Sequence, residues 1–273
     1  MCGIAGFISP SLNEEHLHRI TRALQHRGPD AEGFYFDAKT QVGLGHRRLS
    51  ILDLSAAANQ PFYSKDGRYI MVFNGEVYNF KEVAEKYKII AKTSSDSEVI
   101  LEAFALKGID CVSDFNGMFA IAIWDTVEER LFLIRDRFGV KPLVYYKSED
   151  KFAFASELKA LLQLPVKKKI NKAALQSYLY LEYIPGPDCI LEDFYKLPNG
   201  HYAEICRGEM KVLPYYRFRD TIISRPVPVK SENETLDEFE SLLSSSVKYR
   251  QISDVPIGAF LSGGTDSSLI CAL

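Results

Sequence analysis

The amino-acid sequence predicts a protein of mixed α and β structure with two domains. Its 273 residues correspond to about two domains at roughly 150 residues each. Short apolar runs typical of strands occur in blocks, and stretches of helical periodicity separate these blocks. One segment, RPVPVKSENE at 225–234, is rich in proline and charge and poor in large apolar residues, which is typical of a linker. We therefore expect a first domain over 1–215, a linker over 216–234 and a second domain over 235–273.

The first domain begins with a strand and a helix. Residues 4–8 contain a continuous apolar run that predicts a buried strand and places Cys2 at its free end. From Asn13, a candidate N-cap, to Gly28 and the proline after it, the spacing predicts an amphipathic helix. Its apolar face carries Leu17, Ile20 and Leu24.

Strand patterns dominate the middle of the first domain. YIMVF at 69–73 and EVYN at 76–79 flank the dipeptide Asn74-Gly75, which often forms the turn of a hairpin. MFAIAIWD, RLFLIRDR, LVYYKSED and KFAFAS follow one another with polar turns between them and predict an antiparallel meander. HYAEI and MKVLPYY, joined by CRGE, predict a further hairpin.

Helical periodicity returns on both sides of the meander. Asp96 and Ser97 are candidate caps of a helix that closes at Gly108. Further helices are expected over 158–164 and 172–181. Helices placed between blocks of antiparallel strands are typical of the α+β class.

The second domain begins with an amphipathic helix over 236–247, followed by VPIGAFL at 255–261, which predicts a buried strand. SGGTDSS at 262–268 then opens another helix. A glycine turn, hydroxyl groups and a helix N-terminus behind a strand form a phosphate cradle, because N–H groups and hydroxyls there donate to an oxyanion. The loop lacks the lysine of a Walker A motif. A Gly-Gly turn taken alone is more often only a turn.

Composition and charge narrow the function. A formal net charge of -3 gives no electrostatic reason to expect nucleic acid or an anionic membrane as a partner. The longest apolar run, MFAIAIW at 118–124, is far shorter than the ~18 residues of a membrane span, and no basic region precedes an apolar stretch at the start. We therefore expect the cytoplasm. The five cysteines have no CxxC spacing and predict neither a disulfide framework nor a metal site.

Cys2, directly behind the initiator methionine, is a candidate N-terminal nucleophile. Cytoplasmic processing removes a methionine that precedes a small residue, which leaves Cys2 with a free α-amine. Because an α-amine has a pKa of ~7.7 to 8.0 and a thiol one near ~8.5, the amine can take the thiol proton without a histidine. The alternative is a cysteine buried as a small hydrophobic residue, which is the commoner fate of an arbitrary cysteine.

Six motifs together carry a resemblance to a known family. They are MCGIAGF at the start, HRGPD at 26–30, RLSILD at 48–53, NGEVYN at 74–79, SDSEVI at 95–100 and SGGTDSS at 262–268. In this order they resemble glutamine-hydrolysing asparagine synthetase. The resemblance implies a class II glutamine amidotransferase domain with the four-layer αββα fold of N-terminal nucleophile hydrolases. It also implies that 235–273 is the truncated start of an α/β synthetase domain of the ATP-pyrophosphatase type.

The resemblance assigns the glutamine chemistry to three residues. Cys2 would attack the side-chain amide of glutamine and form a γ-glutamyl thioester. The side-chain amide of Asn74 and the backbone N–H of Gly75 look like the oxyanion hole, two neutral donors aimed at the developing negative oxygen.

Further residues would bind glutamine. Arg48 is similar to the arginine that pairs with the substrate α-carboxylate, where a planar fork suits two oxygens. Glu76 and Asp96 resemble the acidic partners of the α-ammonium. The same pocket would be lined by Leu49, Ser50, Ile51 and Leu52, with Arg27 and Gly28 shaping the loop beside it.

In the complete enzyme the resemblance implies ATP and Mg2+ as cofactors and aspartate as the ammonia acceptor, with no metal for glutamine hydrolysis itself; a homodimer is a further prediction. The ATP loop would comprise Leu261, Ser262, Gly263, Gly264, Asp266 and Ser267. We expect the present chain to hydrolyse glutamine without ATP, to bind ATP negligibly and to make no asparagine.

Each residue also has an alternative role. Arg48 follows another arginine, and a surface position is the commoner fate of either. The Asn-Gly dipeptide is more often only a hairpin turn, and Asp96 only a helix cap. His26 and His46 suggest a cysteine–histidine dyad, but an N-terminal nucleophile already has its base, so we assign both to structure. The conjunction of motifs in the expected order favours the functional interpretation.

Two further hypotheses remain open. Thr265 stands where common synthetases carry an apolar residue, so the acceptor can be a different carboxylate, such as a sugar acid. A non-catalytic module on the same scaffold is the third hypothesis. Such a module need not keep Cys2, Arg48, Asn74 and Asp96, and this chain has all four.

Overall fold

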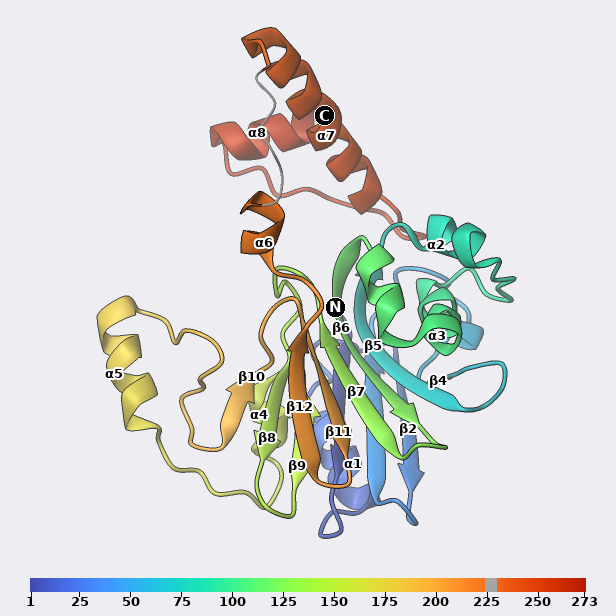
Figure 1. The fold of residues 1–273 in the computed structure, drawn as a ribbon, viewed down its shortest axis with the longest axis vertical. Helices are drawn as coiled ribbons and strands as arrows, with labels where there is room; N and C mark the ends of the chain where they lie inside the picture. The colour runs from blue at the N-terminus through green and yellow to red at the C-terminus, as the bar shows by residue number, and fades with distance from the viewer. Residues whose placement is uncertain (224–229) are drawn as a thin grey trace.

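A computed structural model describes residues 1–223 and 230–273 of the chain; part of the predicted linker, residues 224–229, lies outside the described residues. Two six-stranded antiparallel sheets lie face to face, and helices cover their outer faces (Figure 1). The layers follow the order helix, sheet, sheet, helix. This arrangement confirms the predicted αββα sandwich.

The first sheet carries the N-terminal strand at its centre. The strand order is β10-β8-β9-β1-β3-β2, with β1 (Gly3–Ile8), β2 (Ala31–Asp37), β3 (Val42–Arg48), β8 (Val144–Lys147), β9 (Phe152–Ala155) and β10 (Phe194–Lys196). The pairs Gly3↔Arg47 and Ala5↔Ala155 fix the register of β1 against its two neighbours. Because β1 is paired on both sides, the residue that precedes it is held at the end of a rigid strand.

The second sheet has the order β12-β11-β7-β6-β5-β4. Its strands are β4 (Phe62–Tyr63), β5 (Tyr69–Val77), β6 (Gly117–Asp125), β7 (Arg130–Arg135), β11 (His201–Cys206) and β12 (Glu209–Pro214). β5 runs straight through Asn74-Gly75, so the hairpin suggested by this dipeptide is wrong. The reason is tertiary: β5 pairs with β6 over its whole length, from Tyr69↔Asp125 to Val77↔Gly117.

Three apolar clusters hold the layers together. The cluster between the sheets joins Ile4 and Leu44 of the first sheet to Val72, Ala122 and Leu133 of the second. Helices α1 (Glu14–Arg22) and α4 (Leu158–Leu161) cover the outer face of the first sheet. Helices α2 (Phe80–Tyr87) and α3 (Asp96–Lys107) cover the outer face of the second. The cavity described below lies at one end of this packed core.

Most helix boundaries follow the sequence signals. Asn13 caps α1, its side chain accepting from His16 N at 3.2 Å, as predicted. α3 ends at Gly108, but its N-cap is Ser95 and not Asp96 or Ser97. Asp96 is therefore the first helical residue, and its carboxylate is free for other contacts.

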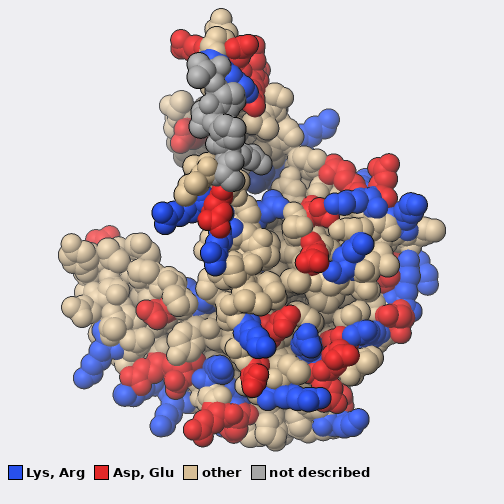
Figure 2. All heavy atoms as spheres, viewed as in Figure 1, with Lys and Arg blue, Asp and Glu red and all other residues tan. Residues whose placement is uncertain are grey.

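The remaining elements of the first domain are short or peripheral. α5 (Lys172–Leu181) has its predicted bounds, whereas the helix expected over 158–164 is only the four-residue α4. Two 3₁₀ segments, η1 (Ala56–Ala58) and η2 (Gly108–Asp114), were not predicted. Helix α6 (Phe218–Ile223) lies inside the segment predicted as linker. In Figure 2, side chains of both charges alternate over the sandwich, as expected from the small net charge.

The C-terminal part consists of two helices joined by an irregular segment. α7 (Glu232–Arg250) begins inside the predicted linker, and α8 (Thr265–Ala272) begins within SGGTDSS, which opens this helix as predicted. The strand predicted over 255–261 is wrong, because the segment has no regular structure and Phe260 is fully exposed. No described strand lies beside it to accept its backbone hydrogen bonds. No helix in the described part of the chain is long and apolar enough to cross a membrane.

Candidate active site

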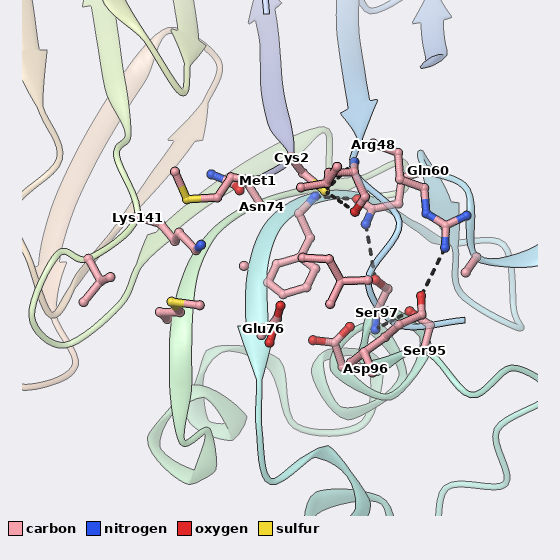
Figure 3. A pocket seen from close by; sticks show the side chains of 18 residues that line it. Met1, Cys2, Arg48, Gln60, Asn74, Glu76, Ser95, Asp96, Ser97 and Lys141 are labelled. Carbon is pink, nitrogen blue, oxygen red and sulfur yellow. Dashed lines mark hydrogen bonds between the residues drawn. The ribbon is translucent and has the colours of Figure 1, made fainter. Parts of the chain in front are cut away.

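A cavity of about 240 Å³ opens beside Cys2, at the end of β1. Its wall is formed by the end of β3, the loop that follows it, the second half of β5 and the start of α3 (Figure 3). All the predicted glutamine-site residues except Ser50 line it, namely Cys2, Arg48, Leu49, Ile51, Leu52, Asn74, Gly75, Glu76 and Asp96. Ser50 instead donates its backbone N–H to Asp30 Oδ2 at 2.8 Å.

The Cys2 thiol is held by the chain that follows β3. Its Sγ lies 3.6 Å from Leu49 O and 3.4 Å from Leu49 N, so the sulfur can donate to the carbonyl and accept from the N–H. The Cys2 carbonyl accepts from Arg27 Nε at 2.9 Å, and Arg27 is in turn paired with Glu157 at 2.8 Å. These hydrogen bonds hold the thiol and the carbonyl group of Cys2. The next residue, Gly3, already belongs to β1, so the backbone of Cys2 is also held by the sheet.

The electrostatics at the N-terminus favour an amine as the base. Burial raises the pKa of the Cys2 thiol, which holds it protonated near neutral pH. Burial also lowers the pKa of the N-terminal amine, here that of Met1, and the positive charges of Lys141 and Arg27 lower it further. A lowered pKa increases the neutral fraction of the amine, and a neutral amine beside a thiol is the pairing that N-terminal nucleophile chemistry requires; after removal of Met1 that amine would belong to Cys2.

The two histidines considered as alternatives have structural partners. His46 is buried, and its Nε2 lies 3.1 Å from the carbonyl oxygen of Phe73. Burial lowers the pKa of His46 to about 3, so the ring stays neutral near pH 7. His26 lies 3.0 Å from Glu157 and is half exposed. Both contacts agree with the structural role expected for these residues.

The open edge of β5 presents one unpaired backbone donor to the cavity. Phe73 N donates to Gln60 Oε1 at 2.6 Å, and Val77 N donates to Asp96 Oδ2 at 2.9 Å. Gly75 lies midway between these residues, so the two-residue period of a strand points its N–H to the same edge. No described residue accepts a hydrogen bond from Gly75 N.

The Asn74 side chain is a second unpaired donor. Asn74 is 0% exposed, and neither its Oδ1 nor its Nδ2 has a hydrogen-bond partner in the described structure. A buried amide without partners costs free energy, and such groups are rare outside functional sites. Figure 3 shows Asn74 next to Cys2. The two unpaired donors, Asn74 Nδ2 and Gly75 N, therefore belong to the same part of the cavity.

Gly75 is a position where a side chain is excluded. A Cβ added there would lie 2.2 Å from Met118 O and 2.8 Å from the Phe73 ring. The close approach of β6 therefore requires glycine.

Arg48 lines the cavity while its guanidinium holds the adjoining loop. Nη1 donates to Ser55 O at 2.8 Å and to Asn59 Oδ1 at 2.7 Å. Nη2 donates to Leu52 O at 3.2 Å and also to Asp53 O. The cation thus orders the loop that forms one wall, and its terminal nitrogens already have partners.

Two carboxylates face the cavity without a paired cation. Burial raises the pKa of Asp96 to about 7, and the nearby charge of Glu76 adds to this increase. Burial also raises the pKa of Glu76, against the attraction of Lys141. Neither carboxylate forms an ion pair within the described part of the chain. A buried and a half-buried carboxyl group next to a cavity form a site for an ammonium group, which would favour their charged forms.

Comparison with known proteins decides the family. A family model described as the glutamine amidotransferase domain matches residues 1–216. The chain belongs to the glutamine amidotransferase family. A second model, for asparagine synthase, matches residues 238–273.

Relatives of this amidotransferase include two proteins named as asparagine synthetases. The chain is 38% identical to putative glutamine-hydrolysing asparagine synthetase 2 of Methanocaldococcus jannaschii, over 99% of this chain and 56% of the relative. It is 38% identical to glutamine-hydrolysing asparagine synthetase 2 of Bacillus subtilis, over 99% of this chain and 38% of the relative. The amidotransferase chain therefore spans about half of these relatives or less.

A solved structure shares the fold. Glutamine phosphoribosylpyrophosphate amidotransferase from B. subtilis, described with ADP and GMP, has a TM-score of 0.58 at 18% identity, covering 79% of this chain and 49% of that chain. This likeness agrees with the αββα sandwich described above.

Sequence reasoning missed several residues of the amidotransferase cavity. Gln60 accepts from Phe73 N and donates to Ser97 Oγ at 3.2 Å, so it links β5 to α3. Lys141 lines the wall opposite, and Asp136 holds its loop by accepting from Lys141 N at 2.9 Å. The only sequence signal for Lys141 is its place in a glycine-containing turn, RFGVKP, directly after a strand.

The predicted ATP loop lies apart from the glutamine cavity and is exposed. Gly263 has φ +84°, which favours glycine, and a Cβ there would meet nothing within 4 Å. Ser262 Oγ lies 3.0 Å from Ser267 Oγ, and Ser267 donates to Gly264 O at 3.1 Å. Five of the loop's residues are exposed, namely Leu261, Ser262, Gly263, Gly264 and Asp266, and Ser267 is half-buried. Glycine turn, hydroxyls and helix start fit a phosphate group chemically, but no described sheet supports them.

Proposed function

We propose that this protein hydrolyses L-glutamine to glutamate and ammonia through a thioester on Cys2. One observation carries the proposal: a buried side-chain amide and a backbone N–H, both unpaired, lie in the cavity beside a cysteine at the N-terminus. Unpaired buried donors next to a nucleophile are what an oxyanion hole requires.

The first half of the reaction follows from this arrangement. After removal of Met1, the α-amine of Cys2 takes the thiol proton, and the sulfur attacks the side-chain carbonyl carbon of glutamine. The oxygen becomes an oxyanion that accepts hydrogen bonds from Asn74 Nδ2 and Gly75 N. The tetrahedral intermediate collapses, the carbon–nitrogen bond breaks, and the protonated amine returns its proton to the leaving ammonia.

The second half regenerates the enzyme. The amine takes a proton from water, and the hydroxide oxygen attacks the thioester carbon. The carbon–sulfur bond breaks, the thiolate regains its proton from the amine, and glutamate leaves. The same two donors stabilise the second oxyanion, so one site serves both steps.

The cavity wall explains how glutamine would be oriented. Asp96 and Glu76 would face the α-ammonium, because both carboxylates lack a paired cation. The positive charge of Arg48 would attract the α-carboxylate, while its terminal nitrogens hold the loop over 52–55. The carbonyl oxygen of Leu49 orients the Cys2 thiol. A volume of about 240 Å³ suits a single small amino acid.

Beyond glutamine hydrolysis, we assign the ammonia to ATP-dependent synthesis of asparagine from aspartate in the whole protein. The names of the relatives and the asparagine synthase match over 238–273 support this assignment. When bound, ATP would activate the acceptor carboxylate, and Mg2+ would accompany it; the candidate residues are the six of the exposed loop. The domain boundaries at 215 and 235, a location in the cytoplasm and assembly as a homodimer stay predictions.

A direct test uses intact mass and turnover on one sample. Mass spectrometry should show loss of Met1, and an enzyme-coupled assay should show glutamate formed from glutamine without ATP. Hydroxylamine should divert the thioester to γ-glutamyl hydroxamate, because it is a better nucleophile than water. A processed, folded sample that forms neither glutamate nor hydroxamate contradicts the proposal.

A further inference from the structure

The segment after α7 makes direct hydrogen bonds to the wall of the glutamine cavity. Asp254 N donates to Ile51 O at 2.9 Å, and Asp254 Oδ2 accepts from Asp53 N at 2.7 Å. Asp254, which lies 201 positions after Asp53 in the chain, thus binds both ends of the three-residue stretch 51–53. Leu52, between the two bonded residues, lines the cavity.

This stretch is held from one side by Arg48 and from the other by Asp254. Arg48 donates to the carbonyls of Leu52 and Asp53, and Asp254 binds the adjacent carbonyl and N–H. Asp53 has φ +51°, a conformation that a non-glycine residue adopts only when its surroundings support it. Its carboxylate is engaged elsewhere, with Ser55 and Ser94. Asp254 is therefore the acceptor for the Asp53 N–H.

Neighbouring contacts dock the same segment onto the amidotransferase domain. Tyr249 Oη donates to Glu82 of α2 at 2.7 Å, and the Arg250 guanidinium lies 5.3 Å from the centre of the Tyr78 ring. Ile252 packs against the apolar cluster under the second sheet. In Figure 1 the end of α7 approaches α2 at this point. Within this interface, Asp254 is the residue that contacts the wall of the cavity.

We propose that Asp254 is a positioning residue for glutamine binding: it fixes residues 51–53 from the C-terminal part of the chain and so couples that part to the glutamine cavity. The inference rests on the proposed glutaminase function. Because Asp254 touches only the outer face of the wall, it acts on how glutamine is held and not on bond breaking. Its removal should therefore change KM more than kcat.

The test compares two substitutions at one position. Asp254→Ala removes the acceptor for Asp53 N, and we expect KM for glutamine to rise about fivefold while kcat stays within about twofold. Asp254→Asn keeps an acceptor oxygen and should restore most of the affinity. Tyr249→Phe is the matched control, because it breaks a hydrogen bond of the same interface that does not touch the cavity wall; its KM should equal that of the unaltered protein.

A second measurement needs no glutamine. Hydrogen exchange of the amides over 49–55 should be faster in Asp254→Ala than in Asp254→Asn or Tyr249→Phe, whether or not the protein turns over. If the unaltered protein hydrolyses glutamine and Asp254→Ala leaves both KM and exchange unchanged, the positioning role is wrong. If Asp254→Ala and Asp254→Asn raise KM equally, the contact is not a hydrogen-bond restraint. Faster exchange in a protein without turnover would overturn the glutaminase proposal alone.

Discussion

Two glycine-containing segments, Asn74-Gly75 and Gly263-Gly264, suggest oxyanion binding, yet their surroundings differ. Asn74 is 0% exposed, and an added Cβ at Gly75 would lie 2.2 Å from a backbone oxygen of β6. Around Gly263 an added Cβ would meet nothing within 4 Å, and the preceding Leu261 is 62% exposed. The first segment is part of a closed strand pair; the second stands in solvent.

The difference shows what a motif needs in order to become a site. Donors buried beside Cys2 are turned toward the cavity in low-dielectric surroundings, so a negative oxygen there is stabilised strongly. The donors of the exposed loop are hydrated, and hydration weakens their attraction for a phosphate. The comparison predicts strong effects from changes in the cavity and none on glutamine turnover from changes in the loop.

The largest effect is expected at the nucleophile. Cys2→Ala should lower glutamine hydrolysis by about 10⁴-fold or more, because no neighbouring group can replace a covalent nucleophile. The thermal unfolding midpoint should stay close to that of the unaltered protein, since within the described structure the Cys2 side chain hydrogen-bonds only to the backbone of Leu49.

The control for this substitution is a non-cleavable N-terminal tag, which turns the amine into an amide without basicity. The tagged protein should be as inactive as Cys2→Ala. Full turnover with the tag in place would show that another base takes the thiol proton. Turnover in Cys2→Ala would rule out a thioester intermediate on this residue.

The next effect tests the buried donors. Asn74→Ala should lower kcat by about 10²-fold with a smaller change in KM, because the lost hydrogen bond strengthens only when the oxyanion forms. Steady-state kinetics separate the two constants. Asn79→Ala is a matched control: the Asn79 amide bonds the backbone of Asp114 and Asn116 at 2.9 and 2.8 Å. It should lower stability and leave kcat unchanged. An Asn74→Ala effect confined to KM would rule out the oxyanion role.

A third effect concerns pH and substrate affinity. Burial raises the pKa of Asp96 to about 7, so its carboxylate is charged above that pH and neutral below it. An α-ammonium is attracted only by the charged form, so KM for glutamine should rise as the pH falls from about 8 to 6. Asp96→Asn should raise KM about tenfold at pH 8 and remove most of this dependence. An unchanged pH dependence in Asp96→Asn would assign the ammonium to another group.

The smallest effect is expected at the exposed loop. Asp266→Asn and Ser267→Ala should leave glutamine turnover within about twofold, because neither side chain contacts the cavity. Calorimetric titration of the 273-residue chain with Mg-ATP should show negligible heat of binding. A dissociation constant in the micromolar range would break the comparison, since exposed donors would then suffice for a phosphate site.

Local signals predicted those parts of the fold that local interactions decide. The Asn13 cap, the bounds of α5 and the hairpin of β11 and β12 all follow from residues close in sequence. The Asn74-Gly75 dipeptide failed as a turn signal, because pairing with β6 outweighs the local preference for a turn. VPIGAFL failed as a strand because a strand needs neighbours, which periodicity does not report.

Site residues that belong to a recognisable motif could be predicted from the sequence. Residues whose role depends on a contact between distant segments could not. The motifs around Cys2, Arg48 and Asp96 identified side chains that meet in one cavity. Gln60 acts through the backbone of Phe73, and the partnership exists only once β5 lies beside the loop that carries Gln60. The contact of Asp254 with the cavity wall likewise joins segments that no sequence spacing relates.

The central place of β1 in its sheet has a consequence for the order of events during synthesis. β1 pairs with β3 on one side and with β9, residues 152–155, on the other. A ribosome adds about 5–20 residues per second, so the N-terminal strand waits on the order of ten seconds or more for its second neighbour. During that interval Cys2 would be a solvated residue of a nascent chain, accessible to an aminopeptidase that would remove Met1. The proposed nucleophile would therefore gain its surrounding cavity only late in synthesis, after β9 has been made and the two sheets have packed together.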